Sequence, residues 1–206
     1  MGKRIFTFGL LTVSLLLATG QSSAKNPLDR YFGATIKGKI LVASPTISDK
    51  RFRQSVILMV DHDADGAFGL IINKPLYSIK KSTLFDKLNL KHEPDENFIT
   101  IFYGGPVDPK LGFVIHEAEY SIDATRRVTD EISVSPERDV ILAMAKGEGP
   151  KRYVFALGYS GWLSGQLEFE MRRRDWLIAP ANSKIVFDDS HHTKWQRASN
   201  IQYQTL

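Results

Sequence analysis

Residues 157–168 read LGYSGWLSGQLE, in which an apolar, strand-like run enters a segment with three glycines, Gly158, Gly161 and Gly165. Glycine adopts backbone conformations that other residues avoid, and it lets two backbones approach closely. The pattern therefore predicts that a strand over 153–157 ends in a tight turn that extends to Gly165. A helix should follow, to about residue 174.

Three earlier segments show the same pattern of apolar residues that lead into Gly, Pro or Asn. They are GLIINKP at 69–75, YGGPV at 103–107 and GFVIH at 112–116. Together with residues 157–168 they resemble the AlgH/YqgE family of small bacterial proteins, over roughly residues 38–195. The resemblance implies a partly open, barrel-like sheet with helices packed outside. It implies no known substrate.

The same segments supply a candidate ligand or structural site. His116 matches a histidine of the family, whereas the family often has alanine at the position of Ser160. The candidate residues are Asn73, Gly104, Gly105, Pro106, His116, Gly158, Ser160, Gly161, Trp162 and Gly165.

Apolar runs between turn residues predict the remaining elements. Strands are expected over 38–43, 55–60, 67–72, 98–103, 112–116, 126–134, 176–178 and 184–187. Helices are expected from Ser82 to about Leu88, from Pro136 to Gly147 with Ser135 as N-cap, and around Trp195. Most strands are joined by turns, with helices inserted singly, so the pattern favours an α+β fold with a mixed or antiparallel sheet over a doubly wound fold.

The first 24 residues have the pattern of a secretory signal peptide. Lys3 and Arg4 precede an apolar run, and Ser22-Ser23-Ala24 supplies small residues for cleavage. We therefore expect a periplasmic or secreted protein with a single domain over 25–206 and no membrane attachment after processing. If this segment is not a signal, the cytoplasmic placement usual for the family applies.

Composition excludes several functional classes. The chain has no cysteine, which rules out disulfides, thiolate catalysis and cysteine-based metal sites. Its net charge is +4, and loss of Lys3 and Arg4 with the signal leaves 25 basic residues against 23 acidic ones. A nearly neutral chain does not favour nucleic acid as a partner. The basic run Arg172–Arg174 is interpreted as a solvated helix face.

Two segments have ligand-like residues without the pattern of a metal site. Asp61–Gly66 matches the first half of a calcium loop, but the position of its bidentate acid falls on Ile72. Asp188–His192 combines acids with two histidines, and adjacent side chains point in different directions. Both segments are interpreted as polar loops, so we expect no metal and no cofactor.

Two functional classes remain open. The first is a non-enzymatic binding or regulatory protein, which would act on an unknown protein or small-molecule ligand in the cleft between the Gly-rich turns. The second is an uncharacterised hydrolase that would use His116 with the Ser160 and Ser164 turn. The hydrolase motif G-x-S-x-G needs glycine where this chain has Trp162. The sequence therefore favours the binding protein, with no catalytic residue assigned.

Overall fold

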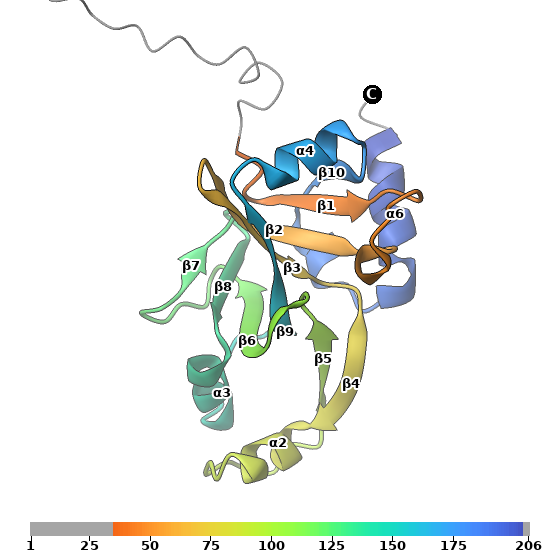
Figure 1. The fold of residues 1–206 in the computed structure, drawn as a ribbon. Helices are drawn as coiled ribbons and strands as arrows, with labels where there is room; N and C mark the ends of the chain where they lie inside the picture. The colour runs from red at the N-terminus through yellow and green to blue at the C-terminus, as the bar shows by residue number, and fades with distance from the viewer. Residues whose placement is uncertain (1–34, 204–206) are drawn as a thin grey trace, which may run out of the picture. The chain divides into compact units, whose positions relative to one another are not determined.

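The computed structural model describes residues 35–203, and their fold is organised around one long strand, β9 (Tyr153–Leu163). Along one edge β9 pairs antiparallel with β6 (Val107–Glu117). Along the other edge it pairs in parallel with β5 (Phe98–Tyr103) and then antiparallel with β3 (Gly66–Ile71). β9 therefore joins two parts of one curled sheet (Figure 1).

The first part of the sheet is an antiparallel group in the order β10–β1–β2–β3. It adds β10 (Trp176–Pro180), β1 (Lys39–Ala43) and β2 (Val56–Asp63) to β3. β2 and β3 pair directly through a turn at residues 64–65, with a register shift between Met59 and Asp61. The strands expected over 55–60 and 67–72 therefore form a β-hairpin.

The second part contains β5, β6 and three further strands. β4 (Pro75–Lys80) pairs with β5, and β8 (Ile132–Pro136) lies between β6 and β7 (Arg126–Arg127). Among the described strands, β5 and β9 form the one parallel pair. The prediction of a mixed, largely antiparallel, partly open sheet is confirmed.

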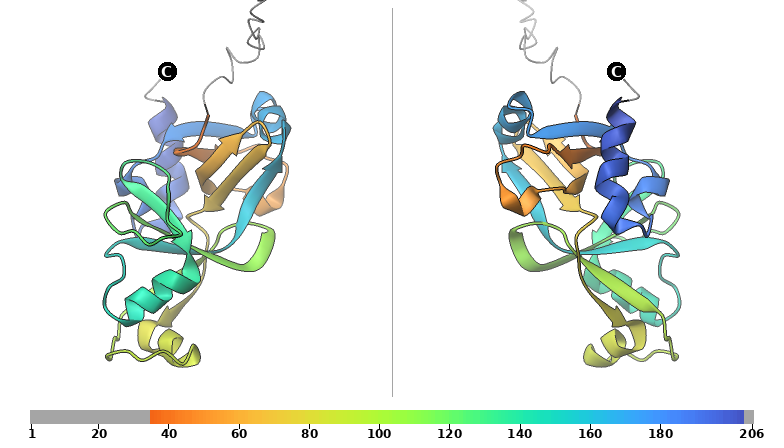
Figure 2. Two further views of the ribbon diagram at one scale, coloured as in Figure 1. Left: turned by 90° about the vertical axis from the view of Figure 1, so that its left-hand side faces the viewer. Right: turned by 90° about the vertical axis from the view of Figure 1, so that its right-hand side faces the viewer.

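Short helices cover this sheet. α6 packs on β10, β1 and β2, and α4 packs on β9, β10 and β3 (Figure 2). α3 packs beside β6 and β8, and α2 follows the far end of β4 (Figure 1). The helices are η1 (Lys50–Phe52), α2 (Lys81–Lys87), α3 (Glu137–Ala145), α4 (Gln166–Arg172), α5 (Ser183–Val186) and α6 (His191–Tyr203).

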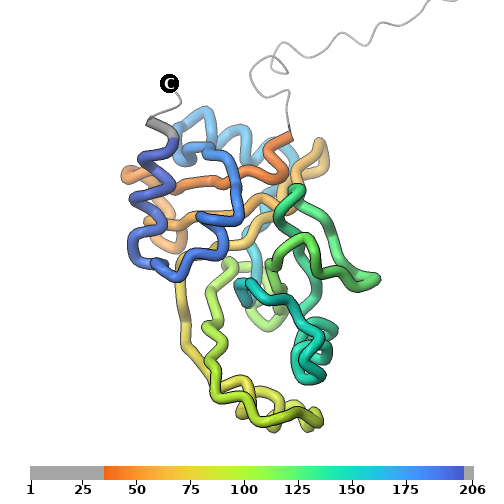
Figure 3. Tube along the Cα trace, turned by 180° about the vertical axis from the view of Figure 1, so that it is seen from behind, coloured from red at the N-terminus to blue at the C-terminus, as the bar shows by residue number. Residues whose placement is uncertain are grey.

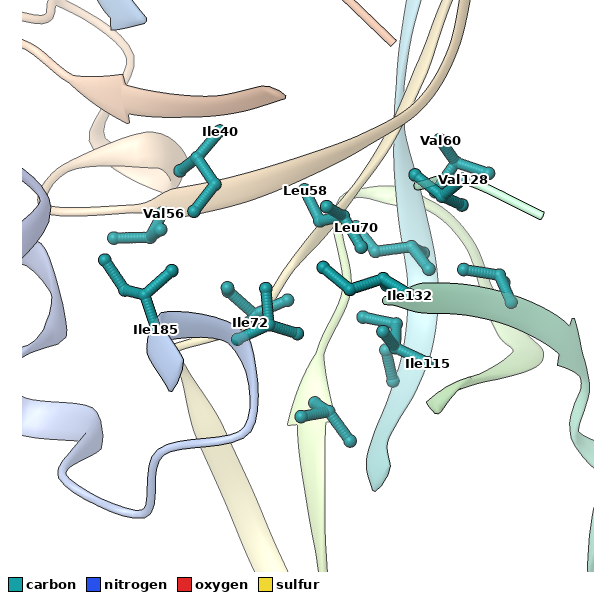
Figure 4. Close-up of a cluster of buried hydrophobic side chains, with 14 of the residues drawn as sticks. Ile40, Val56, Leu58, Val60, Leu70, Ile72, Ile115, Val128, Ile132 and Ile185 are labelled. Carbon is teal, nitrogen blue, oxygen red and sulfur yellow. The ribbon is translucent and has the colours of Figure 1, made fainter. Parts of the chain in front are cut away.

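Alternation along the strands divides the apolar side chains among three buried clusters. Ile40 and Val42 of β1 enter the largest cluster, which joins both parts of the sheet to α5 and α6 (Figure 4). Leu41 and Ala43 enter a second cluster, together with side chains of α4 and η1. A third cluster holds α2 and α3 against the second part of the sheet. β1 reads as a continuous apolar run because both of its faces are covered.

The prediction that the strand ends in a turn directly after residue 157 is wrong. β9 continues through Gly158, whose φ is +71°, and ends at Leu163, so that the turn into α4 contains only Ser164 and Gly165. β3 pairs with this extension from Ser160 to Leu163. Ser160 therefore lies inside a strand and not at a strand-to-helix elbow.

Other element predictions need correction. Residues 184–187 were expected as a strand but lie largely in α5, because the Asn182 side chain accepts a hydrogen bond from Ile185 N and caps a helix. The strand expected over 126–134 is two strands, β7 and β8. The sequence predicted Ser135 as the N-cap of α3, but the N-cap is Pro136 and the helix begins at Glu137.

The strand β4 was not predicted at all. The described residues, 35–203, belong to one compact unit, and the predicted signal over 1–24 lies outside them.

Candidate functional site

The Gly-rich segments meet where the chain crosses over β9. Because β5 and β6 lie on opposite edges of β9, the connection at 104–106 must pass across this strand. A Cβ atom on Gly104 would lie 2.2 Å from the carbonyl oxygen of Gly158, and one on Gly105 would lie 2.1 Å from the carbonyl carbon of Tyr159. The two backbones are therefore in direct contact, and the cleft expected between the Gly-rich turns does not exist.

The other residues of these segments have different local roles. Ser160 is fully buried, and its hydroxyl donates to the carbonyl of Gly104 across the contact, at 3.3 Å. Gly165 has φ +72° and begins α4, as a turn residue should. Gly161 is exposed and has no positive φ, so its predicted backbone role is wrong. Pro106 follows the crossing and leads into β6.

Asn73 clamps the start of β2. Its side-chain oxygen accepts from Val56 N at 2.8 Å, and its amide nitrogen donates to the carbonyl of Gln54 at 2.9 Å. Gln54 has φ 54°, a conformation that a non-glycine residue adopts at a cost. The Asn73 amide thus holds a strained turn, which is a structural role.

His116 belongs to a buried chain of hydrogen bonds. Its Nδ1 bonds to the carbonyl of Glu117 and its Nε2 to the hydroxyl of Ser135, both at 2.8 Å, and Ser135 bonds to Thr125 at 2.8 Å. A carbonyl only accepts, so Nδ1 carries the proton and Ser135 donates to Nε2. Burial lowers the pKa of His116. This network ties the segment before β7 to the sheet.

The structure does not bring His116 and Ser160 together. On the β6–β9 ladder His116 lies opposite Tyr153, seven residues from Ser160 along β9. At about 3.3 Å per residue this separation is roughly 20 Å. The His116–Ser160 pair expected for a hydrolase is therefore not assembled.

Trp162 lies in an aromatic group that also contains Trp176 and Phe52. The indole nitrogens of Trp162 and Trp176 both donate to the same carboxylate oxygen of Glu170, at 2.9 and 2.8 Å. Gln166 donates to the other oxygen at 2.9 Å. Sequence reasoning missed this role of Glu170, because nothing in the spacing links the two indoles to one acid.

A groove with mainly polar walls lies between β5, the start of β9 and the segment that joins α5 to α6. The backbone of these segments can be followed from behind in Figure 3. The groove has a volume of about 320 Å³. We call it the polar groove, and its side chains include those of Phe98, Thr100, Lys151, Arg152, Asp189 and His191. None of the ten candidate residues from the sequence lines it.

His191 is the histidine that faces this groove. Its ring packs edge-on against Phe102, at 4.7 Å between centroids, and its Nδ1 is buried without a hydrogen-bond partner. Burial lowers the pKa of His191. The next residue, His192, is exposed. The segment 188–192 was interpreted as a solvated loop, so its place in the wall of a groove corrects that interpretation.

The charged residues of the groove differ in their partners. Arg197 binds both carboxylate oxygens of Asp188, at 2.7 and 3.0 Å, and lowers the pKa of that acid to about 2. Arg152 donates to Glu117 at 3.4 Å and to the carbonyl of Ser183 at 3.2 Å. Within the described part of the chain, the ammonium of Lys151 and the carboxylate of Asp189 form no ion pair.

A second, more apolar pocket of about 300 Å³ lies beside Phe68, Phe113 and Val134. Arg126 reaches its rim, but its guanidinium is paired with Asp61. Ser135 borders this pocket, yet its hydroxyl bonds to His116 on the opposite face of the sheet. The pocket thus has no free polar side chain.

Neither of the two ligand-like segments forms a metal cluster in the described chain. Asp61 pairs with Arg126, and Asp63 accepts from the backbone of Asp65. Over residues 35–203 no group of three or more His, Asp or Glu side chains could hold a metal ion. In the same part of the chain, no helix is long and apolar enough to cross a membrane.

Comparison with known proteins gives consistent matches over most of the chain. A family model described as AlgH-like matches residues 40–204. A UPF0301 protein of Cereibacter sphaeroides is 40% identical over 161 residues, which are 78% of this chain and 88% of the relative. One of Nitrosococcus oceani is 37% identical over 166 residues, 80% of this chain and 88% of the relative.

Solved structures agree. The solution structure of the AlgH protein from Pseudomonas aeruginosa superposes with a TM-score of 0.69 at 34% identity, over 82% of this chain and 89% of that one. A crystal structure of a protein from Corynebacterium diphtheriae has a TM-score of 0.60 at 21% identity, over 78% and 83% of the two chains. The second likeness concerns the fold alone.

Proposed function

This chain belongs to the AlgH-like family, and from that premise we propose that it is a non-enzymatic binding protein which holds a small polar ligand in the polar groove. The groove is concave and combines aromatic side chains with hydrogen-bonding and charged groups, and small-molecule sites are concave surfaces on which a few polar groups orient the ligand. Its volume of about 320 Å³ lies at the lower end of the range of ligand pockets and therefore suits a small molecule.

The observation that carries this proposal is the unpartnered Nδ1 of His191. A buried polar atom without a hydrogen bond costs about 1–3 kcal/mol, so native proteins rarely leave one unpaired without a reason. A ligand in the groove that draws the His191 ring around and bonds to this buried nitrogen would recover that free energy. Perturbed titratable groups in a cleft, here His191 and Asp188, are also typical of functional sites.

The residues that a hydrolase would need support the binding function instead. His116 uses both ring nitrogens in internal hydrogen bonds, and the hydroxyl of Ser160 is buried against a carbonyl. A nucleophile and its base must lie within hydrogen-bond reach of each other, and these two residues do not. Ser160→Ala should therefore leave the ligand affinity unchanged.

A screen with defined probes tests the proposal. Free amino acids, mononucleotides and monosaccharides would be mixed with the protein and followed by ligand-observed NMR. We expect at least one class to bind, and binding to be lost in Thr100→Trp, which fills the groove. His191→Leu should weaken binding, whereas the matched change His192→Ala should not. Binding that survives Thr100→Trp would place the ligand elsewhere and refute the proposal.

We also propose that the protein acts outside the cytoplasm, on the pattern of residues 1–24. N-terminal sequencing of protein from fractionated cells should find Lys25 first, in the periplasm or the medium. Intact Met1 in the cytoplasmic fraction would contradict this proposal without affecting the one on the groove.

A further inference from the structure

We infer that the ligand of the polar groove is a small zwitterion, a free amino acid with an apolar or aromatic side chain. This inference rests on the proposed function, because it names the ligand class of the same groove. The fold brings two opposite charges to this groove and leaves both without an ion-pair partner.

The groove has one free charge of each sign. Lys151 supplies a positive charge at the start of β9, and Asp189 supplies a negative charge in the segment before α6. The other two charged residues of the lining have internal partners, Arg197 for Asp188 and Glu117 for Arg152. Lys151 and Asp189 share the groove but do not pair with each other. A ligand with a carboxylate and an ammonium group would complement both.

His191 indicates which wall should receive the ammonium group. Its Nδ1 is unpartnered, and its pKa is lowered by burial and by the Lys194 ammonium, whereas the Asp189 carboxylate acts in the opposite direction and raises it. Burial disfavours the charged imidazole, and a neutral ring with its proton on Nε2 presents Nδ1 as an acceptor. The exposed carboxylate of Asp189 would accept hydrogen bonds from an ammonium group, which only donates, and the buried Nδ1 would accept a further one once the His191 ring turns toward the ligand.

Lys194 does not take the place of the ligand. Its side chain is fully buried and does not line the groove, and its ammonium donates to the carbonyl of Val186 at 2.8 Å and forms no ion pair with Asp189. On the opposite wall, Lys151 is exposed and free to meet a carboxylate. The two ends of the zwitterion are thus assigned to different walls.

Aromatic side chains line the groove together with these charges. Phe98 is 60% exposed, a high value for a phenylalanine, and it lines the groove together with Phe102 and Phe187. Arg152 lies over the ring of Phe187, at 5.1 Å from its centroid. An apolar or aromatic side chain of the ligand would cover Phe98 and remove apolar surface from water.

Three probes that differ in one group each test the inference by calorimetry at pH 7. L-Phenylalanine has both charges, phenethylamine lacks the carboxylate, and 3-phenylpropanoate lacks the ammonium group. We expect L-phenylalanine to bind and each analogue to bind at least about tenfold more weakly, since each loses hydrogen bonds to a charged group.

Variants assign each charge to its wall. Lys151→Met should weaken L-phenylalanine at least about fivefold and leave phenethylamine unchanged, since that probe has no carboxylate to lose. Asp189→Asn should weaken L-phenylalanine and leave 3-phenylpropanoate unchanged. Lys87→Met in α2, outside the groove, is the matched control and should have no effect.

The outcomes separate the two proposals. If an analogue binds as tightly as L-phenylalanine and no longer binds to the Thr100→Trp variant, the groove is a binding site but its ligand is not a zwitterion. If neither Lys151→Met nor Asp189→Asn changes the affinity for L-phenylalanine, the assignment of charges is overturned. If L-phenylalanine and every probe of the wider screen fail to bind, the proposed function itself fails.

Discussion

Replacement of Gly158 by alanine tests the backbone crossing at the centre of the fold. Gly158 has φ +71°, and a Cβ atom there would lie 2.5 Å from the carbonyl oxygen of Gly105 and 3.0 Å from that of Val107. A left-handed conformation costs a non-glycine residue about 1–2 kcal/mol. Forcing an extra carbon against fixed backbone costs about 1–3 kcal/mol more. We therefore expect Gly158→Ala to lower the free energy of unfolding by about 2–5 kcal/mol.

Two other glycines of the same segment separate these contributions. Gly165 has φ +72° but no atom within 4 Å of an added Cβ, so Gly165→Ala should cost only the conformational part, about 1–2 kcal/mol. Gly161 is exposed, has no positive φ, and an added Cβ would lie 3.2 Å from the Tyr159 ring. Gly161→Ala should change stability by less than about 0.5 kcal/mol.

Urea denaturation of the three purified variants measures their free energies of unfolding. The values can be compared provided that the slope of this free energy against urea concentration is the same in all three. The expected order of destabilisation is Gly158→Ala, then Gly165→Ala, then Gly161→Ala. If Gly158→Ala were no worse than Gly165→Ala, the close contact of the two backbones would be refuted. If Gly158→Ala does not fold, its soluble yield beside that of Gly165→Ala gives the same order.

Three further outcomes are expected. Burial lowers the pKa of Lys194 to about 8 from an ordinary 10.5. Between pH 8 and pH 10.5 the unfolded chain therefore binds more protons than the folded chain, so the free energy of unfolding should rise with pH, by at most about 3 kcal/mol. Burial also raises the pKa of Tyr153 to about 12, so the free energy of unfolding should fall again above pH 10. Melting curves of Lys194→Met, recorded over the same pH range, should lose the increase below pH 10 and keep the decrease above it. Glu170→Leu leaves the indoles of Trp162 and Trp176 without an acceptor and should lower the free energy of unfolding by about 2–4 kcal/mol. Glu170→Gln keeps an acceptor oxygen and should cost less than half of that. Denaturation followed by tryptophan fluorescence measures both changes. Excess EDTA should leave the melting temperature unchanged, since no three-residue ligand group exists over residues 35–203; a fall that Asp61→Ala abolished would reveal a metal site.

The sequence predicted the parts of the fold that local signals determine. The β2–β3 hairpin has two apolar runs around a polar turn, and α4 begins at a glycine and carries buried Leu167. β4 escaped prediction because most of its side chains are exposed and show no alternation. α5 was mistaken for a strand because its apolar pair Ile185–Val186 outweighed the capping signal of Asn182.

The candidate site was harder to predict than the fold. Gly104, Gly105 and Gly158 stand out in the sequence, but a glycine that allows a contact between backbones looks the same in sequence as one that borders a cleft. The polar groove depends on β5, β9 and α6, which are far apart in sequence. His191 was noticed as one of a pair, yet only the fold shows that it faces Phe102 while His192 faces solvent.

The histidine side chains provide the most direct measurement of the central claim, that the polar groove binds a ligand at His191. Long-range ¹H–¹⁵N NMR spectra of the protein would be recorded during a titration with L-phenylalanine. We expect the Nδ1 resonance of His191 to shift as it gains a hydrogen bond, while the resonances of His192 and of the internally bonded His116 stay unchanged. An Nδ1 resonance of His191 that does not move when the ligand is bound would contradict the claim.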